Sequence, residues 1–134
     1  MQSDVIINKA AIIERCIKRI HEEYEENPEN LNNFTKQDSI ILNIQRAAEA
    51  CIDMAMHIVA EKSYGIPQNS RDAFDLLQAN EFITKELCNR LKAMVGFRNI
   101  AVHDYKNINI HIVQKIIENN LDDIKEFTAH TLKL

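Results

Sequence analysis

The sequence predicts an all-α fold in which four long helices and one short helix form an antiparallel bundle. Glycine and proline occur only twice each among 134 residues and tryptophan is absent, a composition that favours helices over turn-rich sheets. Apolar residues recur at helical spacing in stretches joined by short polar segments, which favours antiparallel neighbours. A chain of this length can bury one core, and no repeat or linker divides it. We therefore expect a single domain over residues 1–134.

The first helix is expected over residues 4–26. Ser3 or Asp4 can cap its amino end, and the pair Asn27-Pro28 can end it. Its apolar face is formed by Ile6, Ile13, Ile17, Ile20 and Tyr24.

The second helix is expected from about residue 36 to residue 63, roughly 42 Å at 1.5 Å per residue. Thr35, followed three residues later by Asp38, resembles a capping box with the shorter acid. Gly65 with Pro67 just beyond is a typical stop signal.

Three further helical patterns complete the bundle. Ser70 can cap a short helix that reaches Leu77, and another helix follows Asn80. That helix has Ile83, Leu87, Leu91, Met94 and Val95 at helical spacing. A final amphipathic helix is expected over residues 109–132.

Composition excludes several classes of function. The formal net charge of −4 provides no basic field for unspecific binding to nucleic acid, so any contact with RNA must be local. Cys16, Cys51 and Cys88 are widely spaced within apolar patterns, which suits buried thiols in a reducing cytoplasm. No CxxC or HExxH spacing occurs, and no segment approaches ~18 uninterrupted apolar residues. We expect a cytoplasmic protein without a metal site, a cofactor or a membrane span.

The stretch GFRNIAVHDY, residues 96–105, departs from the amphipathic pattern. On one helix face positions 91, 95, 98, 102 and 105 line up, so Arg98 falls in a row with Leu91, Val95 and Val102. A buried arginine is costly unless it is paired and hydrogen-bonded, although its stem can lie on apolar surface with its head in water. A subunit interface or an anion site would account for this arginine.

His103 follows Arg98 by five residues, about 140° away in projection on an unbroken helix. If two copies of this helix surface met across a two-fold axis, both copies of Arg98 and His103 would line one groove. Histidine can act as base or acid near neutral pH, and arginine can stabilise a charged phosphorane, so this groove could cleave RNA without metal. Tyr105 could donate to a phosphate or stack on a base. A satisfied surface arginine and histidine remain the alternative.

The segment from Arg98 to Tyr105, RNIAVHDY, resembles the R-x4-H-x-Y signature of HEPN-domain ribonucleases. The surrounding MVGFRNIAVHDY is similar to the HepT toxin branch of that superfamily. RCIKRIHEEY, QDSIILNIQRAAEACIDMAMHIV, GIPQNSRDAF and LDDI also resemble that branch, so the likeness extends over nearly the whole chain.

The resemblance implies a HEPN-like helical homodimer whose two motifs form a composite cleft with metal-independent endoribonuclease activity. It also implies the toxin of a type VII-like toxin–antitoxin pair. Its partner would be a MntA-type minimal nucleotidyltransferase antitoxin that transfers AMP to the motif tyrosine. Arg98 and His103 become the catalytic pair, and Tyr105 becomes the AMPylation target. The RNA substrate could be messenger or transfer RNA.

Six further residues are candidates for supporting the cleft: Asn99, Asp104, Gln45, Arg46, Glu49 and Asp53. The last four form a polar stripe on the second helix, and an exposed, salt-bridged face explains them equally well. Asp104 is best explained as a solvated acid, because its neighbour His103 points elsewhere on a regular helix.

Two alternative functions stay open. The helical dimer could be a non-catalytic binding or regulatory subunit of a nucleotidyltransferase, which the acidic net charge favours slightly. It could also be a purely structural bundle that buries Arg98 against carboxylates such as Glu49 or Asp53.

Overall fold

The computed structural model describes residues 3–134, so Met1 and Gln2 of the predicted domain lie outside the described residues. All regular structure within this range is helical, as predicted. The α-helices are α1 (Asp4–Tyr24), α2 (Phe34–Glu61), α3 (Ser70–Ala79), α4 (Lys85–His103), α5 (Ile110–Lys115) and α6 (Leu121–Thr131). They are joined by 3-10 turns η1 (Pro28–Asn32) and η2 (Tyr105–Asn107) and by a π-helical turn η3 (Ile116–Asn120).

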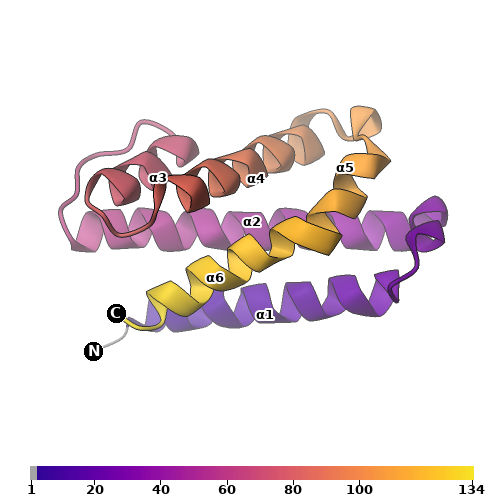
Figure 1. The fold of residues 1–134 in the computed structure, drawn as a ribbon, viewed down its shortest axis with the longest axis horizontal. Coiled ribbons are helices and arrows are strands. Elements are labelled where there is room, and N and C mark those ends of the chain that lie inside the picture. Colours follow the sequence, from indigo (N-terminus) through magenta and orange to yellow (C-terminus); the bar gives the residue numbers. More distant parts are fainter. Residues whose placement is uncertain (1–2) are drawn as a thin grey trace.

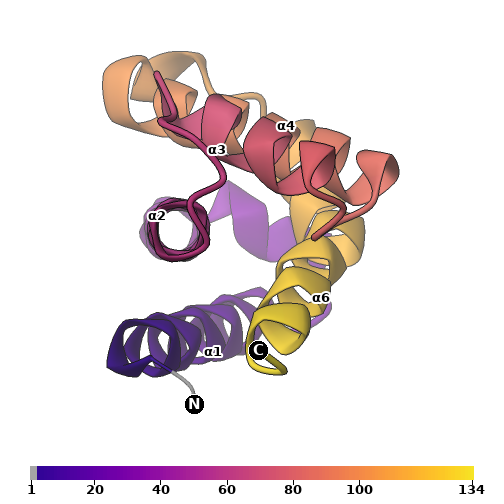
Figure 2. The same cartoon turned by 90° about the vertical axis from the view of Figure 1, so that its left-hand side faces the viewer.

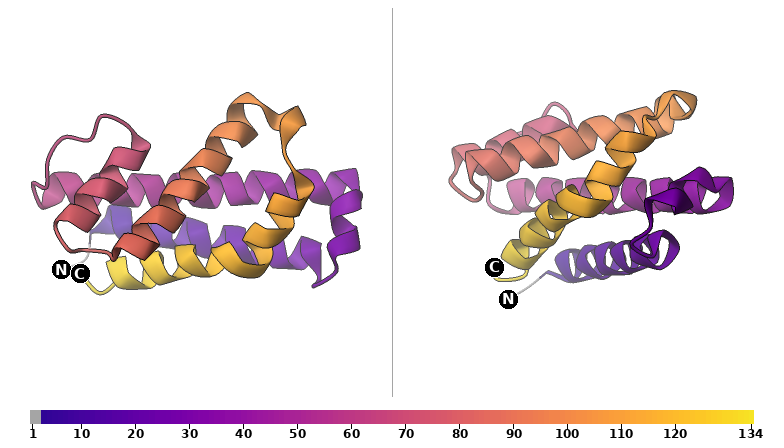
Figure 3. Two further views of the ribbon diagram at one scale, coloured as in Figure 1. Left: turned by 45° about the horizontal axis from the view of Figure 1, so that its top comes forward. Right: turned by 45° about the vertical axis from the view of Figure 1, so that its right-hand side comes forward.

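The helices form a bundle around α2. Figure 1 shows α1 running beside α2, with α3 and α4 above them and the α5–α6 segment crossing obliquely. Figure 3 shows that α4 and α6 run in opposite directions. In Figure 2, α2 is seen end-on between α1 and the α3–α4 layer, with α6 on one side. Within residues 3–134, no helix covers the other side of α2.

The helix starts follow from side-chain caps, two of which differ from the prediction. Ser3 caps α1 by accepting a hydrogen bond from the Val5 N–H, as expected. Asn33, and not Thr35, caps α2 through a 3.1 Å hydrogen bond from the Lys36 N–H. The cap of α3 is Asn69, so Ser70 is the first helical residue and its hydroxyl is available elsewhere.

The predictions of Thr35 and Ser70 as caps are wrong for the same physical reason. A capping residue needs an extended backbone while its side chain accepts from an N–H two or three residues ahead. Asn33 and Asn69 have that backbone, and each starts its helix before the neighbouring hydroxyl residue is reached. For the same reason Asp38 lies inside α2 and takes no part in a capping box.

The ends of the first two helices lie slightly earlier than predicted. The helix α1 ends at Tyr24, because Glu25 adopts the left-handed conformation with φ of 53°. The second helix ends at Glu61, ahead of Gly65, whose φ of 132° suits glycine.

One apolar cluster forms the core, and α2 passes through its middle. Phe74 of α3 meets Phe127 of α6 edge to face at 5.7 Å between ring centres, which ties the two outer layers together. The buried Tyr24 donates a hydrogen bond to Glu118 in η3 and so anchors the π-helical turn to α1. None of the helices within residues 3–134 is long and apolar enough to span a membrane.

Candidate active site

Arg98 lies in the carboxyl-terminal half of α4 and faces α2 and α3. Its Nη2 donates a 3.3 Å hydrogen bond to Ser70 Oγ at the start of α3, and its Nη1 lies 3.8 Å from Glu49 Oε2. Its Nε is buried and has no hydrogen-bond partner among the described residues. The guanidinium is therefore held in place but only loosely neutralised, which leaves it able to attract an anion.

His103 is the last residue of α4 and is exposed. Its side chain makes no hydrogen bond or ion pair with any residue in the described range, so both ring nitrogens are accessible to a substrate. An exposed imidazole at this position can act as a general base or a general acid.

Tyr105 lies in η2 and not on α4, because α4 ends at His103 and Asp104 serves as its C-cap. The expectation that positions 91 to 105 share one unbroken helix face is therefore wrong at its last position. The Tyr105 hydroxyl donates a hydrogen bond to the carboxylate of Asp38 in α2. Burial, together with this bond and the charge of Asp38, raises the pKa of Tyr105 to about 12, so the phenol is protonated at neutral pH.

The apolar row that contains Arg98 is buried at one end and open at the other. Leu91 and Val95 are buried, whereas Val102 is 46% exposed. On the adjacent surface of α2, Leu42 is 41% exposed. Arg98 thus lies where the packed core gives way to an uncovered face with apolar side chains.

Asp104 and Asn99 contribute differently from one another. The Asp104 carboxylate accepts hydrogen bonds of 2.8 and 3.0 Å from Asn107 Nδ2, which closes the η2 turn and leaves His103 without an orienting acid from its neighbour. Asn99 is exposed on α4, and its side chain makes no hydrogen bond within residues 3–134.

The polar stripe of α2 follows the side that no helix covers. Gln45, Arg46, Glu49 and Asp53 are all exposed or half-exposed there. Glu49 contacts Arg98 rather than Arg46, and Asp53 pairs with Lys9 of α1 at 2.8 Å. The stripe therefore includes ion pairs to both flanking helices, and Glu49 is the member that reaches the candidate catalytic residues.

Two contact residues were not predicted for this site. Ser70 was expected as a cap, and Asp38 as part of a capping box. Their partners Arg98 and Tyr105 are 28 and 67 residues away, so no local pattern signals either contact.

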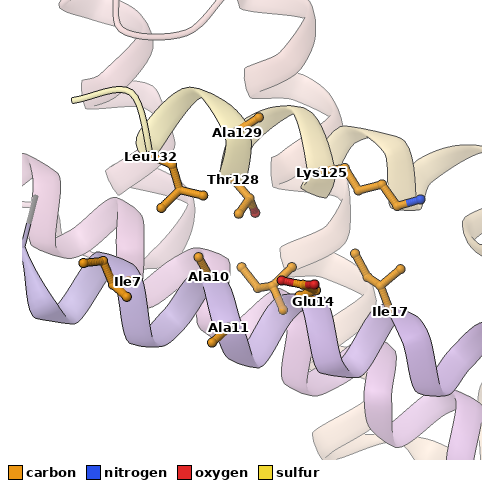
Figure 4. A pocket seen from close by; sticks show the side chains of 10 residues that line it. Ile7, Ala10, Ala11, Glu14, Ile17, Lys125, Thr128, Ala129 and Leu132 are labelled. Carbon is orange, nitrogen blue, oxygen red and sulfur yellow. The ribbon is translucent and has the colours of Figure 1, made fainter.

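The pocket between α1 and α6 is a separate feature. Figure 4 shows its lining of mainly apolar and small side chains, among them Ile7, Ala10, Ala129 and Leu132, around a volume of about 540 Å³. None of the candidate catalytic residues lines it.

Within residues 3–134, no group of cysteine, histidine or acidic side chains is arranged to hold a metal ion. Cys16, Cys51 and Cys88 are free and buried, and burial raises the pKa of each thiol. His57 Nε2 lies 2.9 Å from Glu61 Oε2. His130 packs on Phe82 with ring centres 4.6 Å apart.

The chain is similar to known proteins over almost its full length. The family model of HepT-like ribonucleases matches residues 13–131. A protein of Shewanella oneidensis described as mRNA nuclease HepT is 52% identical over 125 residues, which are 93% of this chain and 94% of that protein.

Two solved structures superpose closely. A crystal structure of a toxin–antitoxin with AMP-PNP contains a chain that is 48% identical with a TM-score of 0.94, covering 98% of this chain and 100% of that one. A tri-AMPylated Shewanella oneidensis HEPN toxin in complex with MNT antitoxin is 49% identical with a TM-score of 0.94. In that case the match covers 99% of this chain and 100% of the other.

Proposed function

This chain belongs to the HepT-like ribonuclease family and is an endoribonuclease toxin of that type, and we propose that Arg98 and His103 carry out its cleavage reaction. The substrate is messenger RNA, as the name of the Shewanella oneidensis relative suggests, and the protein acts in the cytoplasm. The observation that carries the site assignment is the placement of a loosely neutralised Arg98 and a free His103 on one helix beside an uncovered face.

Cleavage needs a base, an acid and a cation. One His103 takes the proton of the ribose 2′-hydroxyl, whose oxygen then attacks the adjacent phosphorus. Arg98 stabilises the extra negative charge on the phosphorane through its donor fork. A second His103 protonates the leaving 5′-oxygen, which yields a cyclic 2′,3′-phosphate and a free 5′-hydroxyl. No step uses a metal ion.

Two histidines imply two copies of the chain. Ile100 and Val102 leave apolar surface exposed on the last turn of α4, beside the candidate site, which supports a homodimer across this face. Two-fold pairing would bring equivalent copies of Arg98 and His103 to one cleft. The supporting roles of Asn99, Asp104, Gln45, Arg46, Glu49 and Asp53 remain part of this proposal, and the Arg98 contact makes Glu49 the best supported of them.

The toxin is silenced when a MntA-type nucleotidyltransferase antitoxin transfers AMP from ATP to the Tyr105 oxygen, which releases pyrophosphate. Support comes from the relatives solved with an antitoxin, one of them tri-AMPylated. Esterification removes the phenolic proton that Tyr105 donates to Asp38 and places a phosphate beside that carboxylate. Repulsion would then move the η2 turn, while the added nucleotide blocks the cleft by charge and bulk.

The deciding experiment combines mass spectrometry with cleavage and growth. Protein made without the nucleotidyltransferase should cleave messenger RNA in the presence of a chelator, leave cyclic phosphate ends and arrest growth. Protein made with it should gain mass in AMP steps on Tyr105 and lose both RNA cleavage and growth arrest. A chain that neither cleaves RNA nor arrests growth, yet binds the transferase stably, would instead be a regulatory subunit.

A further inference from the structure

Two arginines in the groove between α1 and α2 lack a partner. Neither Arg15 of α1 nor Arg46 of α2 makes a hydrogen bond or an ion pair with any residue in the described range. The other arginines each have a protein contact: Arg19, Arg71, Arg90 and Arg98. The groove therefore holds two guanidinium groups that no carboxylate of the described residues pairs with directly.

These two guanidinium groups lie close to one another. Both lower the pKa of Cys16, partly opposing the effect of its burial, so both act on the same buried thiol. Both also line the same two adjoining hollows, of about 440 and 340 Å³, together with Asn43. Like charges repel at short range unless an anion lies between them. This pair is thus arranged to bind an anion.

The groove is continuous with the candidate active site. One hollow is lined by Asp38, which holds the Tyr105 hydroxyl, and the other by Glu49, which contacts Arg98. Along α2 the lining extends from Asp38 to Asp53, about 22 Å at 1.5 Å per residue. A chain of phosphates that enters at Arg98 could therefore continue between α1 and α2.

We propose that Arg15 and Arg46 form a phosphate-binding site that holds the backbone of the single-stranded RNA substrate outside the catalytic cleft. This inference rests on the ribonuclease function proposed above. Guanidinium groups match phosphodiester oxygens in shape and charge. Because the chain as a whole is acidic, a local pair of this kind must supply much of the attraction for RNA.

The test measures RNA binding separately from cleavage. In a His103→Ala background, expected to cleave RNA at least about 10²-fold more slowly, the double variant Arg15→Gln/Arg46→Gln is compared with its parent by fluorescence anisotropy on a single-stranded oligoribonucleotide. Affinity should fall about tenfold, and the slope of log affinity against log salt should fall by about 1.4, at about 0.7 per phosphate. Arg15→Lys/Arg46→Lys keeps both charges and should retain most of the binding.

The matched control is Lys18→Gln/Lys62→Gln. It removes the same charge from exposed positions, one in α1 and one at the end of α2, that line neither hollow. This control should bind RNA within about twofold of the parent. In the His103-containing chain, the arginine double variant should raise KM for RNA about tenfold, because the site proposed here binds the RNA backbone.

Equal RNA binding by Arg15→Gln/Arg46→Gln and by the control Lys18→Gln/Lys62→Gln would overturn this site. The site would also be overturned if Arg15→Gln/Arg46→Gln bound RNA as well as its parent but no longer formed the antitoxin complex. That result would assign the groove to the antitoxin. If the parent chain neither binds nor cleaves RNA, the proposed function itself fails, a result distinct from a parent that cleaves RNA and ignores the two arginines.

Discussion

The hydroxyl of Tyr105 donates a hydrogen bond to the carboxylate of Asp38, which links the turn after α4 to the first part of α2 across 67 residues of sequence. This bond fixes the proposed modification target at the edge of the candidate cleft. Together with burial, the bond raises the pKa of Tyr105 to about 12, above its ordinary value of 10.0.

Asp38→Asn should lower the pKa of Tyr105 from about 12 towards 10.0. The substitution removes the charge of Asp38 and leaves the effect of burial, so the pKa should stay above 10.0. Titration of tyrosinate absorbance measures it, with Tyr105→Phe as the blank. An unchanged titration curve would show that the bond to Asp38 does not form in solution.

The same pKa shift makes stability depend on pH. Between pH 10.0 and about 12, native Tyr105 keeps a proton that the unfolded chain has lost, so its contribution to stability falls as pH rises. Tyr105→Phe should reduce this fall. Thermal unfolding of both proteins across the alkaline range tests the difference, and parallel curves would contradict it.

His103→Ala should reduce RNA cleavage by at least about 10²-fold, the usual contribution of general acid–base catalysis. Folding should be unaffected, because the imidazole is exposed and makes no hydrogen bond or ion pair within residues 3–134. Single-turnover cleavage and thermal unfolding give the two readings. His111→Ala is the matched control, since this exposed histidine lies in α5, and it should cleave normally.

Arg98→Ala should reduce cleavage by about 10²–10³-fold, as expected for removal of a transition-state donor. The unfolding free energy should change by less than about 1 kcal/mol from the loss of the Glu49 contact, because that pair is partly exposed and 3.8 Å apart. Activity, thermal unfolding and sedimentation are measured together. A variant whose dimer dissociates while its monomers fold normally would assign Arg98 a structural role.

Ser70→Ala should reduce kcat several-fold while KM stays nearly constant. The hydroxyl accepts a hydrogen bond from Arg98 Nη2, so its loss should loosen the guanidinium without touching the substrate. Thr35→Ala removes an exposed hydroxyl from α2 and should leave both constants unchanged. A KM effect at Ser70 would indicate direct contact with RNA.

The fold could be predicted from periodicity and composition because each helix has an apolar face that must be buried. The start of a helix was less predictable. Asn33 and Thr35 are both competent caps, as are Asn69 and Ser70, and the choice depends on backbone geometry that residue type alone does not determine.

The candidate site was predictable where it depends on a local motif. Arg98, His103 and Tyr105 lie within eight residues of one another, so the sequence places them together whatever the tertiary structure. Ser70 and Asp38 join them only after α2, α3 and α4 pack, and their side chains fit local capping patterns equally well. Their roles could therefore be recognised only from the folded chain.

The π-helical turn η3, just before α6, contains one residue more than a regular α-helical turn. The Leu121 N–H bonds to the Ile116 carbonyl, five residues back, so the chain here has one residue more than an ordinary turn needs. Deleting exposed Asn119 could convert this turn into regular α-helix and keep Phe127 on the buried side. A deletion at Lys125 would instead rotate everything beyond it by about 100°. The chain can thus lose one residue at this turn while the apolar face of α6 still packs against the core.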